Sequence, residues 1–123
     1  MFEEDLTAKI IGAGIEVHRI LGPGLLESAY GDSLCYELSL SGLALQREVD
    51  VPLMYKDLEI ACGYRADVIV QGAVLLELKA VERVLPVHEA QLLTYLRLTG
   101  IRVGLLLNFN VDVLKKGIVR RVL

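Results

Sequence analysis

The sequence predicts a small mixed α/β sandwich, in the order helix, helix, three strands, helix, strand and short strand. Three observations support this fold class. Apolar residues recur at helical spacing in residues 5–20 and 25–41. Residues 44–80 contain apolar, β-branched segments interrupted by turn residues. A third helical segment then separates two strand-sized apolar segments, which predicts a strand–helix–strand crossover.

The two N-terminal helices are separated by a strong turn signal. The first helix, residues 5–20, stops at Leu21-Gly22-Pro23-Gly24. The second covers residues 25–41, and Gly42 is a suitable terminator. The apolar positions available for packing are Leu6, Ile10, Ile11, Ala13, Val17, Ile20 and Leu21 in the first helix, and Leu25, Leu26, Ala29, Leu34, Leu38 and Leu40 in the second.

The strands follow from residue 44 onward. Residues 44–55 predict one long strand with Val49, Val51 and Leu53 on one side, and Pro52 indicates an edge or a bulge. Lys56-Asp57 predicts a turn, a strand or strands continue to residue 70, and a further strand covers residues 73–80.

The C-terminal third completes the sheet. Pro86 suits the first turn of a helix that Gly100 ends, so we expect a helix over residues 86–99. Strands are expected at 102–107 and 117–122. The crossover should make strands 73–80 and 102–107 parallel within an otherwise antiparallel sheet.

Composition limits the class of protein. The 123 residues are enough for a single domain, 1–123, and the 54% hydrophobic and 24% charged content excludes disorder for most of the chain. No apolar stretch approaches the ~18 residues that a membrane span needs, so no membrane partner is expected. The acidic start lacks the basic region of a secretory signal. Cys35 and Cys62 are read as buried free thiols, which indicates a reducing, cytoplasmic location.

Charge and apolar content bear on partners. The net charge of −3 argues mildly against a strong non-specific grip on nucleic acid. Basic residues cluster at the C-terminus, where they form either a local positive patch or a solvated edge: Lys115, Lys116, Arg120 and Arg121. The high apolar content makes a two-fold homodimer a reasonable hypothesis.

Three charged residues interrupt the apolar strands around residue 72. Asp67 lies in the first strand, and Glu77 and Lys79 share one face of the next strand. A two-residue Gln71-Gly72 loop would place Asp67 opposite Leu76, on the wrong face. A three-residue loop instead puts Asp67 on the face of Glu77 and Lys79, so we predict an odd loop count or a bulge.

Such a group can carry metal-dependent phosphodiester chemistry. Mg²⁺ prefers oxygen ligands, which Asp67, Glu77 and the Leu78 carbonyl supply. The ion would activate a bound water, and Lys79 would orient that water or neutralise charge on phosphorus. The alternative is a surface Asp–Lys–Glu charge network on a half-exposed sheet.

Two helical segments supply candidate supporting residues. His88, Gln91 and Tyr95 fall on one face of helix 86–99, which is either a face that binds nucleotide, phosphate or the metal's water, or a solvent face. Glu27 and Tyr30 are neighbours on the second helix. Glu27 is either a third carboxylate of the site or a residue favoured by the helix dipole, and the preceding His18 either folds back toward it or lies on the surface.

These motifs together resemble a known family. The segment Gly24-Leu25-Leu26-Glu27-Ser28-Ala29-Tyr30 matches the signature of the GxxExxY protein family, which is grouped with the PD-(D/E)xK nuclease superfamily. Nearly the whole chain follows that pattern, at His18, the Leu21-Gly22-Pro23-Gly24 turn, Asp67, Glu77-Leu78-Lys79, His88, Gln91, Tyr95 and Asn108-Phe109. The resemblance implies a restriction-endonuclease-like core, a mixed sheet flanked by helices.

The resemblance also implies roles. Asp67 is similar to the superfamily's strand aspartate, and Glu77 and Lys79 to its E-x-K element. Gln91 and Tyr95 resemble the Q-x-x-x-Y helix motif of RecB-type nucleases, and Glu27 resembles their extra helix glutamate. Ala66 stands where a proline often precedes the aspartate.

The function expected from the sequence is that of a Mg²⁺-dependent nuclease acting on DNA, with Mn²⁺ as a substitute ion. An alternative is a non-catalytic, dimeric binding or scaffold module for an unidentified protein partner. A third option is a hydrolase for a small phosphorylated nucleotide, which would need less positive surface.

Overall fold

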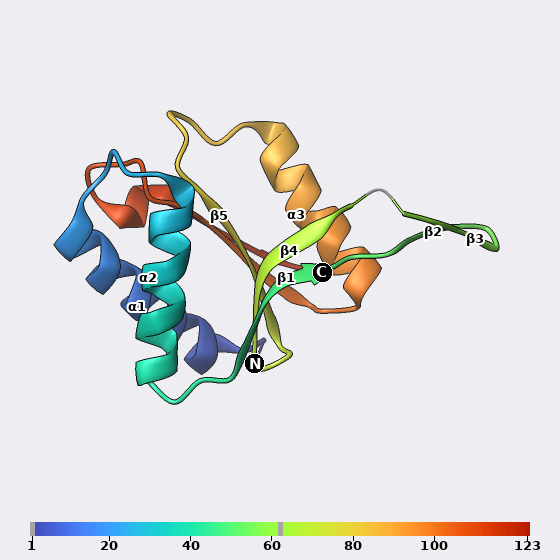
Figure 1. The fold of residues 1–123 in the computed structure, drawn as a ribbon, viewed down its shortest axis with the longest axis horizontal. Helices are drawn as coiled ribbons and strands as arrows, with labels where there is room; N and C mark the ends of the chain where they lie inside the picture. The colour runs from blue at the N-terminus through green and yellow to red at the C-terminus, as the bar shows by residue number, and fades with distance from the viewer. Residues whose placement is uncertain (1, 62) are drawn as a thin grey trace.

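A computed structural model describes residues 2–61 and 63–123, and it places a mixed sheet between helices (Figure 1). Helices α1 and α2 cover one face of the sheet, and α3 lies on the other. The elements are α1 (Glu4–Leu21), α2 (Glu27–Leu40), β1 (Leu45–Asp50), β2 (Leu53–Tyr55), β3 (Leu58–Ile60), β4 (Arg65–Val70), β5 (Val74–Lys79), α3 (Pro86–Thr99), β6 (Val103–Asn108), the 3-10 turn η1 (Leu114–Gly117) and β7 (Ile118–Val122).

The main sheet has five strands in the order β1-β4-β5-β6-β7. Strands β5 and β6 are parallel, and the other three neighbouring pairs are antiparallel. The helix α3 makes the crossover between the parallel pair, as the sequence predicts. The predicted fold class is therefore confirmed.

The single long strand expected over residues 44–55 is wrong. The chain leaves the sheet after Asp50, and residues 53–55 instead form β2, which pairs only with β3 in a separate hairpin. Pro52 lies between the two strands, where its missing N–H costs no ladder bond. The proline thus marks the departure from an edge strand, since β1 is at the sheet edge.

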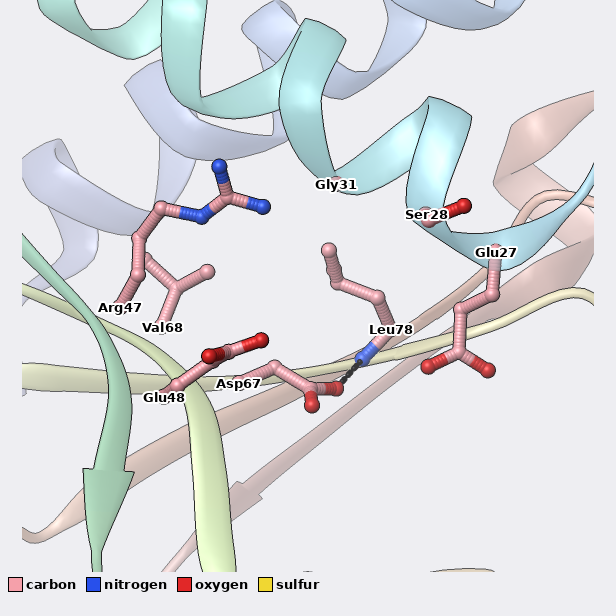
Figure 2. Close-up of a pocket in the computed structure, with 8 residues that line it drawn as sticks. All are labelled: Glu27, Ser28, Gly31, Arg47, Glu48, Asp67, Val68 and Leu78. Carbon is pink, nitrogen blue, oxygen red and sulfur yellow. Dashed lines mark hydrogen bonds between the residues drawn. The ribbon is translucent and has the colours of Figure 1, made fainter.

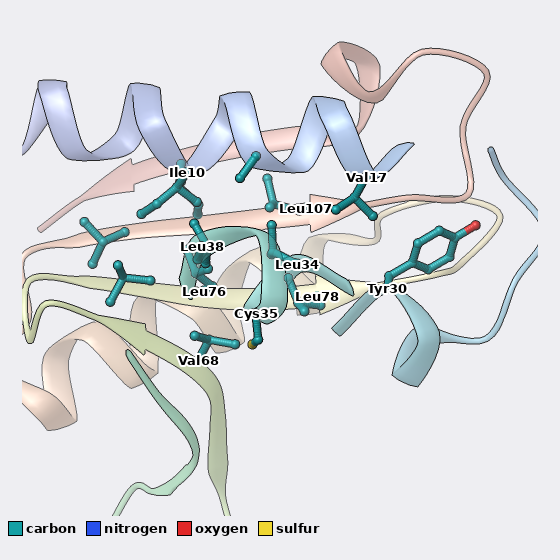
Figure 3. Close-up of a cluster of buried hydrophobic side chains, with 14 of the residues drawn as sticks. Ile10, Val17, Tyr30, Leu34, Cys35, Leu38, Val68, Leu76, Leu78 and Leu107 are labelled. Atoms are coloured by element: carbon teal, nitrogen blue, oxygen red, sulfur yellow. The ribbon is translucent and has the colours of Figure 1, made fainter. Parts of the chain in front are cut away.

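The larger part of the core lies between the sheet and the two N-terminal helices (Figure 3). Its helix side chains include Ile10, Val17, Leu34 and Leu38, and its strand side chains include Val68, Leu76, Leu78 and Leu107. Five predicted packing residues are instead exposed because they lie at or beyond the helix ends, where no other element covers them: Ile20, Leu21, Leu25, Leu26 and Leu40.

The paired strands β1 and β4 change face part-way along. Leu45 packs with the α1–α2 side of the core, whereas Val49 packs with the α3 side. On β4 the same change separates Val68 from Ala66. Glu48, between the two halves of β1, has a φ of 50°, which rotates the strand without changing its register. Residue 67 therefore lies where normal alternation breaks down.

Two other sequence-based expectations concern thiols and membranes. Cys35 is a buried free thiol, as predicted, whereas Cys62 lies outside the described residues. Among the helices of residues 2–61 and 63–123, none has the length and apolar character that crossing a membrane requires.

Candidate active site

The turn between β4 and β5 contains three residues, as the face argument predicts. Val70 pairs with Val74 and Val68 pairs with Leu76, so residues 71–73 form the loop. Gln71 and Gly72 both adopt positive φ values, 56° and 63°, which close this short turn. The resulting register puts Asp67 across from Glu77.

Beyond Val68 and Leu76 the two strands stop pairing, and side chains occupy the gap. The Asp67 amide donates a hydrogen bond to Oε1 of Glu77 at 3.3 Å. The Leu78 amide donates to Oδ2 of Asp67 at 2.7 Å, the bond drawn in Figure 2. Each carboxylate thus accepts a backbone donor of the opposite strand, which fixes both acids at the open end of the pair.

Burial makes this pair of acids electrostatically unfavourable without a cation. Glu77 is only 4% exposed, and burial, followed by repulsion from Asp67, raises its pKa to about 8. Burial also raises the pKa of Asp67, although the Leu78 amide and Lys79 act in the opposite direction. The site therefore favours binding of positive charge.

Glu27 and Lys79 complete the charged group. Burial and then the Asp67 charge raise the pKa of Glu27, which begins α2. The Lys79 ammonium lowers the pKa of all three acids, so it lies within electrostatic reach of each. The helix-derived acid and the strand-derived acids thus share one electrostatic environment.

A pocket of about 330 Å³ lies between α2 and the strands (Figure 2). Glu27 lines it at the start of α2, and Asp67 lines it from β4. Arg47 and Glu48 of β1 also line this pocket, and sequence reasoning missed both. Arg47 pairs with Asp32 of α2 at 2.9 Å. Charges in an edge strand are common, so only their position beside Asp67 in the same pocket distinguishes them.

Tyr30 supports the site indirectly. It is fully buried and its ring stacks on Phe109 with the centroids 4.6 Å apart. Its hydroxyl donates to the Gly22 carbonyl at 2.5 Å and accepts from the Leu25 amide at 3.2 Å. Through these two hydrogen bonds, Tyr30 holds the turn that leads into α2. It therefore helps to set the position of Glu27, the first residue of that helix.

His18 is also turned into the protein. It is 7% exposed, and its Nε2 donates to the Val111 carbonyl at 2.8 Å. This bond joins the end of α1 to the segment that follows β6. Neither His18 nor Tyr30 lines the pocket that contains Glu27 and Asp67.

The three residues predicted on one face of α3 divide into two groups. Gln91 Nε2 donates to the Tyr95 hydroxyl at 3.2 Å, and Tyr95 is 4% exposed. Burial and then the Glu77 charge raise the pKa of Tyr95, which places its phenol near the acids. His88 instead accepts a hydrogen bond from the Leu85 amide at 3.0 Å through Nδ1 and caps the start of α3.

The open end of the strand pair offers oxygen atoms that could hold a divalent ion. In an extended strand the N–H and C=O of one residue point to the same side, so the Leu78 carbonyl faces the gap that its amide shares with Asp67. Across the described residues, no three Asp, Glu, His or Cys side chains are close enough to hold a metal by themselves. Two carboxylates, a carbonyl and water are instead a suitable set for Mg²⁺.

Three of the four C-terminal basic residues are engaged in contacts within the protein. Arg121 pairs with Glu89, and Lys116 pairs with Asp112 at 3.1 Å. Arg120 donates to the Phe2 carbonyl at 2.7 Å. These contacts favour the solvated-edge interpretation of the cluster.

Comparison with known proteins identifies one family. A family model described as the PD-(D/E)XK nuclease superfamily matches residues 4–122. No curated protein and no solved structure shows significant similarity to the chain.

Proposed function

The chain belongs to the PD-(D/E)XK nuclease superfamily, and from this premise we propose that it is a Mg²⁺-dependent nuclease that hydrolyses DNA phosphodiester bonds. One observation carries the proposal. Asp67 and Glu77 are fixed by each other's strands at the open end of β4 and β5, in a buried site with too little positive charge. Superfamily membership supports nucleic acid as the substrate class.

Asp67, Glu77 and the Leu78 carbonyl would hold the ion, with Mn²⁺ as a substitute. Bound there, it would lower the pKa of a coordinated water and stabilise negative charge on the phosphate. Lys79 orients the attacking water and neutralises charge that develops on the phosphoryl oxygens. Glu27, with its raised pKa, faces the pocket from α2, where it can hold a water or a proton. Attack forms a new phosphorus–oxygen bond, and the bond to the leaving oxygen breaks as that oxygen gains a proton.

The remaining candidate residues act as supports in this proposal. Tyr95 and Gln91 hold α3 against the side of the site that Glu77 occupies. Tyr30 and His18 fix the turn and helix that present Glu27, and His88 caps α3. The link from Tyr30 to the glycine turn before Glu27 also supports placing the chain in the GxxExxY group of the superfamily.

Three further assignments belong to the proposal. The family match over 4–122 supports treating residues 1–123 as one nuclease-like domain. The buried, unpaired Cys35 thiol supports a cytoplasmic location. Self-association is the third assignment, and the high apolar content supports it.

A calorimetric titration with Mg²⁺ and Mn²⁺ tests the metal site directly. Asp67→Asn should weaken binding at least about tenfold, since it removes one charged ligand and half of the carboxylate pair. Asp112→Asn is the matched control. Asp112 is an exposed aspartate that pairs with Lys116, and neither residue belongs to the proposed metal site. Wild-type protein that binds neither ion would refute the metal site.

Cleavage assays over single-stranded, duplex and branched DNA, with RNA counterparts, test the reaction. We expect the protein to hydrolyse at least one DNA substrate. This hydrolysis should require a divalent ion and should stop when EDTA is added. A non-catalytic binding module is the second candidate, and the acidic net charge of −3 favours it. Such a module, whether it binds a second copy or an unidentified protein partner, would bind no ion and cleave no substrate.

A further inference from the structure

Asn108 is a buried polar side chain that none of the proposed catalytic steps uses. It is the last residue of β6 and is only 2% exposed. In the parallel register it pairs with Lys79, the last residue of β5. Burying an amide side chain opposes folding unless its polar atoms find hydrogen-bond partners. The partners of Asn108 therefore indicate what it does at this position.

The Asn108 side chain holds one residue of the neighbouring segment by both of its backbone groups. Its Oδ1 accepts a hydrogen bond from the Val81 amide at 3.0 Å, and its Nδ2 donates to the Val81 carbonyl at 2.9 Å. Oδ1 also accepts from the Asn110 amide at 3.3 Å. Because a backbone amide only donates and a carbonyl only accepts, these bonds fix the orientation of the side-chain amide. Asn108 thus continues the pairing of β5 with β6 past the end of both strands.

These bonds hold the chain just after Lys79. Lys79 is followed by residues 80–85, which form neither helix nor strand and lead to α3. A strand end next to such a segment frays readily unless its backbone is held. Here the Phe109 amide donates to the Lys79 carbonyl at 2.9 Å, and Asn108 holds Val81 two residues further on. The backbone that carries the Lys79 side chain is therefore fixed on its C-terminal side.

The residue after Asn108 contacts the other side of the candidate site. Phe109 is fully buried, and its ring stacks on Tyr30 with an interplanar angle of 8°. Tyr30 holds the glycine turn that precedes Glu27. One short segment thus contacts both the strand end that carries Lys79 and the helix that carries Glu27.

We propose that Asn108 is a positioning residue, whose bonds to Val81 hold Lys79 where its ammonium can act on the attacking water and the phosphate. This role rests on the nuclease function proposed above. Displacing a group that orients a reactant by about 1 Å lowers the rate by on the order of 100-fold. The acids should be affected less, because Asp67 and Glu77 are held by bonds between β4 and β5 that the Asn108 side chain does not join.

Steady-state cleavage by Asn108→Ala protein tests this role. We expect kcat to fall at least about tenfold, because Lys79 is no longer held in one position. The KM for the DNA substrate and the calorimetric dissociation constant for Mg²⁺ should each change less than about twofold. A variant that is merely less stable would instead keep the wild-type kcat when assayed well below its melting temperature. An unchanged kcat in the folded variant would overturn the role.

Leu105→Ala is the matched control. Leu105 is fully buried in the same strand as Asn108 and pairs with Leu76. This substitution opens a cavity in the core, so it should lower the melting temperature without changing kcat. Asn108→Ser is a second variant, because its hydroxyl can satisfy one of the freed Val81 groups if Asn108→Ala does not fold. It should show the same fall in kcat at an unchanged KM, and circular dichroism should show it folded.

A double substitution separates positioning from a general effect. In a Lys79→Ala background, Asn108→Ala should lower the residual cleavage rate less than about twofold, because the ammonium that Asn108 positions is absent. Losses that multiply as if the two residues were independent would overturn the proposal. Wild-type protein that cleaves no substrate would refute the nuclease function itself, and this role with it. Cleavage by the wild type and an equal kcat for Asn108→Ala would refute the positioning role alone.

Discussion

The two ends of the β4–β5 pair differ in the groups that accept hydrogen bonds from the backbone amides. At the closed end, Val70 and Val74 pair through the ladder beside the turn, and both are fully buried. At the open end, the ladder stops and the carboxylates of Asp67 and Glu77 accept the backbone donors instead. Glu77 is nearly as buried as the valines, yet it carries an ionisable group.

Within this one hairpin, the closed end contributes to the stability of the fold and the open end carries the candidate functional groups. Apolar burial at the closed end stabilises the fold in proportion to the area removed from water. Burial of acids at the open end opposes folding whenever they ionise, as the raised pKa of Glu77 shows. A buried acid pair that costs stability is typical of a functional site, and the ion proposed above would offset that cost.

The largest expected effect is on chemistry at the open end. Lys79→Ala should lower cleavage at least about a thousandfold, because it removes the ammonium proposed to orient the water and to neutralise charge on the phosphate. Its melting temperature should stay near that of the wild type, since Lys79 lies at the end of β5 and contributes little to the core. Lys116→Ala, at an exposed lysine in an ion pair, is the control and should cleave normally. Undiminished cleavage by purified Lys79→Ala protein would refute the mechanism.

A substitution next to Glu77, but on the other face of β5, should have the opposite profile. Leu76 is fully buried in the α1–α2 side of the core, and Leu76→Ala should destabilise the protein by about 3 kcal/mol. Chemical denaturation measures this loss. Mg²⁺ affinity of the folded variant should change less than about twofold. A large loss of affinity would show that the two faces are not independent.

The smallest expected effect is a pH dependence of stability without metal. The pKa of Glu77 is raised from 4.5 to about 8 in the folded protein, so the folded state holds its proton longer than the unfolded state. Its contribution to stability is therefore complete below about pH 4.5 and is lost as the pH rises to about 8.

Glu77→Gln should remove this dependence and be more stable than the wild type above pH 8, by roughly 2 kcal/mol. Thermal melts in EDTA across that pH range provide the measurement. At high pH, excess Mg²⁺ should raise the melting temperature of the wild type. It should raise that of the variant less. Parallel pH profiles of the two proteins would contradict this assignment.

Much of the fold and the acidic pair follows from local patterns in the sequence. The register set by a three-residue turn between β4 and β5 is enough to place Asp67 across from Glu77. The helix between two apolar strands is enough to make β5 and β6 parallel. Both arguments use only positions along the chain and the fixed geometry of helices and strands.

Other features depended on contacts between distant segments. His18 bonds a carbonyl 93 residues away, and Tyr30 stacks on Phe109, which no local period indicates. The positive φ of Glu48 turns β1 so that Val49 faces α3, and the chain then leaves the sheet to form the β2–β3 hairpin.

The sequence by itself determined the helices, the parallel pair and the register that opposes the two acids, because the fixed geometry of helices, strands and turns sets these features. Only the tertiary structure decided which polar groups are satisfied by the backbone, where β1 ends and which apolar faces stay uncovered. These outcomes depend on burial and hydrogen bonding among segments that meet only after folding.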